Sequence, residues 1–89
     1  MRAVITVKGA DAVGIIAKVS GLLAKNDVNI IDISQTTVEN RFLMVMLVET
    51  EGAQVTFSQI NEMLSDLGES IGQSITMRHE QVFNSMHRI

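Results

Sequence analysis

The sequence has no cysteine, no proline, no tryptophan and no tyrosine. Without cysteine it can form neither a disulfide framework, nor a thiolate zinc site, nor a thiol nucleophile. The aromatic residues are Phe42, Phe57 and Phe83, too few for the stacking platform with which proteins bind single-stranded nucleic acid. The core must therefore come from the Val, Ile, Leu, Met and Ala side chains that dominate the 46% hydrophobic fraction.

Positive charge is also scarce. Seven Lys and Arg residues against ten Asp and Glu give a net charge of -3, and the basic residues do not cluster along the sequence. A nucleic-acid interface needs such a cluster, so we expect no nucleic-acid partner. The first residues lack the pattern of a signal peptide, and no apolar run approaches the roughly 18 residues of a membrane span. We therefore expect a cytoplasmic protein with no membrane partner.

Length and periodicity together predict one α+β domain over residues 1–89. β-branched and alternating stretches predict four strands, at residues 3–8, 29–38, 41–49 and 73–80. Helical spacing predicts one helix after the first strand, with its apolar stripe at Val13, Ile15, Ile16, Val19, Leu22 and Leu23, and another after the third strand. The order βαββαβ indicates a ferredoxin-like sandwich with a four-stranded antiparallel sheet (order 4-1-3-2), two helices on one face and a short helical tail.

Residues that favour helix ends and tight turns support these elements. Asp11 is a suitable N-cap for the first helix, and Asn40 suits the tight hairpin between the second and third strands. Thr56 and Gln59 match a capping box at the start of the second helix. Gly68 is the predicted C-terminal cap of that helix.

Strand 41–49 is apolar on both faces, whereas in strand 29–38 alternation places Ile31 and Ile33 on one face and Ile30 and Asp32 on the other. Helices can cover only one face of the sheet. We therefore expect a homodimer or a larger assembly that covers the second face.

No nucleophile with an adjacent base is apparent, which favours a protein that is not an enzyme and uses no cofactor. His79 and His87, with Glu80 nearby, could bind a divalent metal, but their spacing is not diagnostic of a ligand set. We therefore expect solvated surface histidines and no metal site.

The run GADAVGIIAKVSGLLAKNDVNIIDISQ, residues 9–35, resembles the ACT domain, a regulatory module for small ligands, and in particular its stand-alone members of the UPF0237 group. Similar patterns occur in glycine-cleavage regulators and formyltetrahydrofolate deformylases. The residues that carry the resemblance are Gly9, Asp11, Gly14, Ile15, Val19, Ser20, Asn29, Ile30, Asp32, Ser34 and Gln35. Ala12 and Val13 depart from it, since many relatives have Arg or Lys with Pro at these positions.

The resemblance implies an amino-acid site between subunits, built from the first loop and the start of the second strand. By this resemblance Asp11 takes the ligand's ammonium group, and the amides of Val13, Gly14 and Ile15 hold its carboxylate. Asn29 could bond either group.

Ala12 completes the candidate loop, while Asp32 and Gln35 are weaker candidates. Structural alternatives remain: Gly14 could serve a tight helix-to-sheet contact, and Asn29 could be a turn residue of positive φ. The whole chain could also be a ligand-free interaction module that docks a partner enzyme or regulator.

Overall fold

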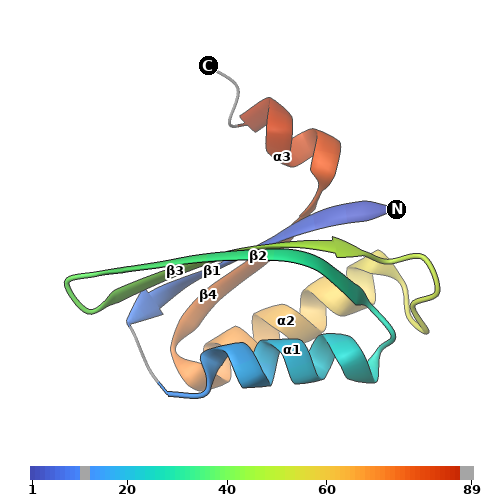
Figure 1. Ribbon diagram of the computed structural model, residues 1–89. Helices are drawn as coiled ribbons and strands as arrows, with labels where there is room; N and C mark the ends of the chain where they lie inside the picture. The colour runs from blue at the N-terminus through green and yellow to red at the C-terminus, as the bar shows by residue number, and fades with distance from the viewer. Residues whose placement is uncertain (11–12, 87–89) are drawn as a thin grey trace.

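The computed structural model describes residues 1–10 and 13–86, and within them the predicted order of strands and helices is confirmed. The elements are β1 (Arg2–Ala10), α1 (Ile15–Lys25), β2 (Asn29–Val38), β3 (Arg41–Glu49), α2 (Phe57–Ile71), β4 (Gln73–His79) and α3 (Glu80–Met86). The four strands form one sheet in the order β2-β3-β1-β4, and every neighbouring pair is antiparallel. Figure 1 shows α1 and α2 on one face of this sheet and α3 on the other.

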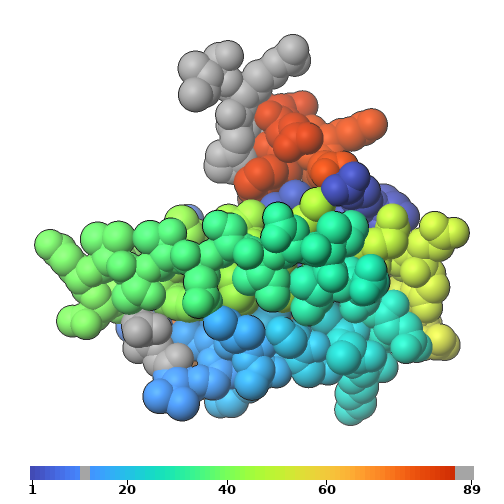
Figure 2. Space-filling model, viewed as in Figure 1, coloured from blue at the N-terminus to red at the C-terminus, as the bar shows by residue number. Residues whose placement is uncertain are grey.

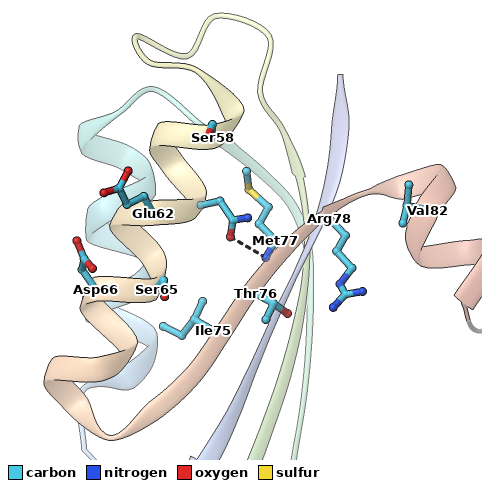
Figure 3. A pocket seen from close by; sticks show the side chains of 10 residues that line it. Ser58, Glu62, Ser65, Asp66, Ile75, Thr76, Met77, Arg78 and Val82 are labelled. Atoms are coloured by element: carbon cyan, nitrogen blue, oxygen red, sulfur yellow. Dashed lines mark hydrogen bonds between the residues drawn. The ribbon is translucent and has the colours of Figure 1, made fainter.

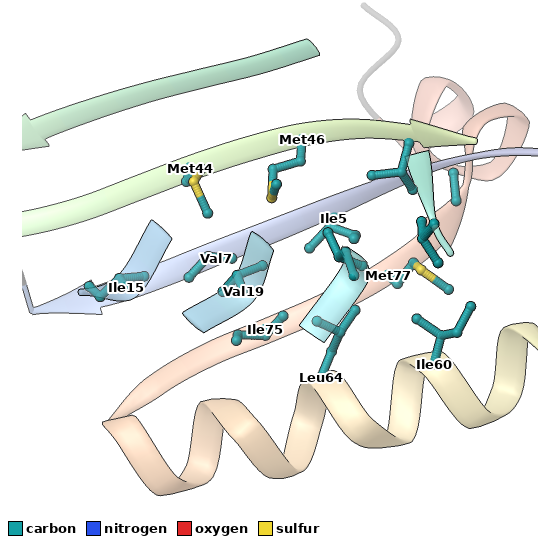
Figure 4. Packing of buried hydrophobic residues seen from close by; sticks show 14 of the residues in the cluster. Ile5, Val7, Ile15, Val19, Met44, Met46, Ile60, Leu64, Ile75 and Met77 are labelled. Atoms are coloured by element: carbon teal, nitrogen blue, oxygen red, sulfur yellow. The ribbon is translucent and has the colours of Figure 1, made fainter. Parts of the chain in front are cut away.

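The core lies between the sheet and its two helices (Figure 4). The largest side chains that are fully buried come from the sheet and from both α1 and α2: Ile5, Val7, Val19, Leu23, Met44, Met46, Val48, Ile60 and Leu64. Each contributes about 1.5–3 kcal/mol relative to an exposed position. Aliphatic and Met side chains thus build the core, as the composition predicts.

Both predicted local signals around the third strand are confirmed. Glu39 and Asn40 have φ of 49° and 67°, the left-handed conformation of a tight hairpin turn. At the start of α2 the backbone N–H of Gln59 donates to Thr56 Oγ1 at 3.2 Å, and that of Thr56 donates to Gln59 Oε1 at 2.9 Å. These two bonds form the capping box.

The predicted end of α2 is wrong. The helix continues to Ile71, and Gly72, with φ of 72°, is its C-cap. Gly68 lies instead inside the helix and is buried, where an added Cβ would lie 2.5 Å from the backbone oxygen of Gln73 and 3.0 Å from Ile75 Cγ1. Gly68 is therefore required by close packing of α2 on β4 rather than by the helix end.

The predicted faces of β2 are partly wrong because the strand contains a β-bulge. Ile30 pairs with Val48, but Asp32 already pairs with Leu47, so Ile31 is an extra residue. The bulge places Ile30 and Ile33 on the face that carries the helices, and it places Asp32 on the other face.

The apolar stripe of α1 is narrower than predicted. Its buried residues are Ile15, Val19 and Leu23, whereas Ile16 is 38% exposed and Val13 precedes the helix and is fully exposed. Within residues 1–10 and 13–86, no helix has both the length and the apolar character needed to cross a membrane.

The second face of the sheet is only partly covered. Leu43 is 43% exposed on it, and Val45 and Leu47 are half-buried. The tail is helical, as predicted, but Phe83 is half-buried while Val82 is 49% exposed. Apolar surface therefore remains on this face.

His79 is not the solvated surface residue that the sequence suggested. Its ring stacks on Phe57 with a centroid distance of 4.2 Å and an interplanar angle of 16°. His87 lies outside the described residues. The half-buried His79 thus joins the end of β4 to the start of α2.

Candidate functional site

The start of α1 leaves backbone N–H groups without partners inside the helix. Gly14 occupies the N-cap with φ of 88°, and no side chain of the described residues caps the helix. The first helical bond runs from the N–H of Lys18 to the Gly14 oxygen at 3.0 Å, so the amides of the three residues between them have no acceptor within the helix. The prediction of Asp11 as N-cap is wrong because Gly14 holds that position. Asp11 and Ala12 themselves lie outside the described residues.

Those uncapped residues line a pocket of about 340 Å³. Its lining is Gly14, Ile15, Ile16 and Ala17 from the start of α1, Gln35 and Thr37 from β2, and Phe42 from β3. The helix end supplies backbone donors and a partial positive charge, while Gln35 and Thr37 can both donate and accept. These described residues include no ionisable side chain. The pocket can therefore hold a small anionic group by amides alone, with a polar group of the same ligand opposite.

Gly14 is needed for its backbone conformation. A Cβ at this position would meet nothing within 4 Å, so the alternative of a tight helix-to-sheet contact is wrong. The φ of 88° is one that residues with side chains rarely adopt. This glycine allows the chain to enter α1 with its first amides uncapped.

One chain does not bring Asn29 to the loop. β1 and β2 run in the same direction, each antiparallel to β3, and Asn29 lies opposite Glu49 and in line with Arg2. The loop follows the other end of β1, so Asn29 and Gly14 are separated by the length of α1, about 16 Å for eleven residues.

Two further expectations for β2 concern the side chain of Asp32 and the backbone conformation of Asn29. Asp32 is exposed on the face away from the helices, and its Oδ1 accepts a bond from the N–H of Ile33 at 2.9 Å. The alternative of a positive φ at Asn29 is wrong, since Asp27 adopts that conformation with φ of 58°.

Sequence reasoning ranked Gln35 low and missed Thr37. The order strand, helix, strand could have identified both residues. A crossover helix makes β2 parallel to β1, which brings the end of β2 rather than its start beside the first turn of α1.

A larger pocket, of about 630 Å³, lies between α2 and the free edge of β4 (Figure 3). Asn61 Oδ1 accepts a bond from the N–H of Met77 at 3.3 Å there, and Glu62 and Asp66 line its outer side. No group of three His, Cys, Asp or Glu residues that could hold a metal occurs in the part of the chain that the structure describes. Size therefore favours this pocket, but unpaired backbone donors favour the smaller one.

A family model for the ACT domain matches residues 2–78. The chain belongs to the ACT domain family. Among its relatives is the UPF0237 protein MJ1558 of Methanocaldococcus jannaschii, 44% identical over 88 residues that make up 99% of this chain and 98% of the relative. The predicted membership of the UPF0237 group is thereby confirmed.

Two solved structures share the fold. An ACT domain protein from Streptococcus pneumoniae is 34% identical, with a TM-score of 0.81 and 93% of each chain covered. The regulatory subunit of aspartate kinase from Thermus thermophilus, in its ligand-free form, is 29% identical with a TM-score of 0.67. That match covers 86% of this chain and 50% of the kinase subunit.

Proposed function

We propose that this ACT domain is a regulatory module that binds an amino acid at the pocket between α1 and β2. The observation that carries the proposal is the set of uncapped amides at Ile15, Ile16 and Ala17, which line the pocket opposite Gln35 and Thr37. In the described structure, the pocket offers no catalytic pair, so the proposal includes no reaction. The likeness to the regulatory subunit of an aspartate kinase supports a regulatory role.

The ligand's two charged groups have different partners. Its carboxylate accepts from the amides of the first turn, where the helix dipole adds favourable charge. Its ammonium donates to the side-chain oxygen of Gln35 or Thr37, with Asp11 as a further acceptor by family resemblance. A pocket of about 340 Å³ is near the lower end of the range for small-molecule sites, which suits a free amino acid.

The outer edge of β2 is the proposed subunit contact. Among the described strands β2 pairs only with β3, and the whole strand is exposed except for Ile30, which is half-buried. Figure 2 shows its side chains along the near face of the molecule, directly above α1. Exposed Ile31, Ile33 and Val38 lie on this strand, and a second copy packed against it would lie beside Gln35 and Thr37. Ligand and dimer would then stabilise each other.

The ligand is tested by a thermal-shift screen of the twenty standard amino acids, followed by calorimetry on those that raise the Tm. Thr37→Val removes a pocket hydroxyl and should weaken binding about tenfold, the effect of losing one hydrogen bond of about 1.4 kcal/mol. Thr36→Val is the matched control, because Thr36 pairs with Leu43 on the opposite face of the sheet. A screen in which no amino acid raises the Tm, or equal losses in the two variants, contradicts the proposal.

The subunit contact is tested by sedimentation equilibrium at micromolar concentration. Ile33→Lys places a charge on the β2 edge and should convert the dimer into a monomer. Val82→Lys, on α3, is the control and should leave the dimer intact. A monomeric wild-type protein refutes the contact.

A second candidate function is a ligand-free interaction module. It is favoured by the partly covered sheet face, where Phe83 of α3 overhangs a groove of about 560 Å³ whose lining includes Leu43 and Val45. Failure of the amino-acid screen together with an altered assembly in Leu43→Lys would support this second function over the first.

A further inference from the structure

Gln73 is the one buried polar side chain among the residues that the structure describes, with 7% exposure. It is the first residue of β4 and pairs with Gly9 of β1. Its amide packs directly against that glycine, since a Cβ at Gly9 would lie 2.5 Å from Gln73 Oε1 and 2.8 Å from Gln73 Cδ. Its Nε2 donates to the backbone oxygen of Ala10 at 2.7 Å. The side chain thus joins the beginning of β4 to the end of β1.

The other half of this amide is left unsatisfied. Gln73 Oε1 is buried and has no hydrogen-bond partner within the described residues. A buried acceptor without a partner lowers stability, and an apolar side chain of the same size would avoid that loss. The position is otherwise suited to an apolar residue, because it lies on the same face of β4 as buried Ile75 and Met77. Residues that break a packing rule in this way often serve a site.

The carbonyl that Gln73 holds is the last group of β1 before the loop that leads to the pocket. Ala10 ends β1, and four residues later Gly14 begins the pocket lining. We propose that Gln73 is a positioning residue of the amino-acid site, which fixes the point where the loop leaves the sheet and so sets the positions of the α1 amides. This inference rests on the proposed function. It adds a residue that touches no ligand and that neither the family resemblance nor the pocket lining identifies.

The test compares Gln73→Leu with wild type in three measurements. The Tm of the free protein should change little, because the substitution removes an unpaired buried oxygen together with the bond to the Ala10 oxygen. Amide hydrogen exchange at Lys18, whose N–H donates to the Gly14 oxygen in the first turn of α1, should become at least tenfold faster. Affinity for the amino acid that gives the largest thermal shift with wild type should fall at least tenfold. Gln81→Leu, on the exposed side of α3, is the control and should change none of the three.

A fourth measurement separates positioning from packing. In Gln73→Glu the carboxyl group can donate to the Ala10 oxygen only when protonated, so exchange at Lys18 should approach the wild-type rate as the pH falls through the pKa of that carboxyl. Ionisation of a buried carboxyl also lowers global stability, so exchange at Ile60, whose N–H donates to the Thr56 oxygen in α2, is followed at the same pH values. A residue that acts only on packing changes both amides alike, whereas a positioning residue changes exchange at Lys18 alone. Exchange at Lys18 within twofold of wild type in Gln73→Leu, or no pH rescue in Gln73→Glu, overturns the proposal. If no amino acid binds wild type, the proposed function fails, while the exchange measurements still decide whether Gln73 positions the loop.

Discussion

Gly68→Ala and Gly21→Ala form a matched pair that measures how tightly α2 packs on β4. Both glycines lie inside helices, where alanine is favoured over glycine by about 0.5–1 kcal/mol. At Gly21 a Cβ would meet nothing within 4 Å, so this variant should gain that amount. At Gly68 the Cβ would lie 2.5 Å from the backbone oxygen of Gln73, and overpacking of this kind costs about 1–3 kcal/mol.

The helix preference is common to both variants and cancels in their comparison. Gly68→Ala should therefore be less stable than Gly21→Ala by about 1–3 kcal/mol, a Tm difference between about 4 and 24 °C in a domain of this size. Urea unfolding at fixed protein concentration measures the free energies, and the m-values check that the same surface unfolds. Equal stability of the two variants would refute the packing argument, because the strand cannot move without disturbing Gln73.

Three other predictions concern local structure. Gly14→Ala should lower stability by about 1–2 kcal/mol and Gly14→Asn by less, since alanine tolerates the φ of 88° less well; urea unfolding checks the order. Thr56→Ala should cost about 1 kcal/mol in the same assay through loss of the capping bond to Gln59. The pKa of Glu49 is lowered from its ordinary value of 4.5, mainly by the hydrogen bond from the terminal ammonium of Met1 and further by the bond from the N–H of Glu51. A lowered carboxyl pKa stabilises the folded state at pH values above 4.5, and this stabilisation is lost as the pH falls through the folded-state pKa. In Glu49→Gln the free energy of unfolding should therefore fall less steeply as the pH is lowered, which urea unfolding at a series of pH values measures.

The parts of the fold that the sequence predicted depend on nearby residues. The capping box needs only Thr56 and Gln59, and the hairpin needs only two residues that tolerate positive φ. Gly68 shows where this reasoning fails: a glycine near the end of a helical pattern resembles a C-cap, but its real constraint is the backbone oxygen of Gln73 on another element. The burial of Gln73 could not be predicted either, because it depends on the register of β4 against Gly9.

The candidate site divides in the same way. The half at Gly14 was readable because a glycine that enters a helix is a local signal, whereas the half on β2 depends on strand direction and on the bulge at Ile31. Simple alternation puts Asn29 on the same face as Ile33. The extra residue at the bulge shifts the alternation by one, so Asn29 lies with Asp32 on the face away from the helices. Thr37 lies beyond the bulge and keeps its place on the helix face. A polar side chain can therefore meet the α1 amides within one chain only from the second half of β2, which is why the proposed ligand contacts pass from Asn29 to Gln35 and Thr37.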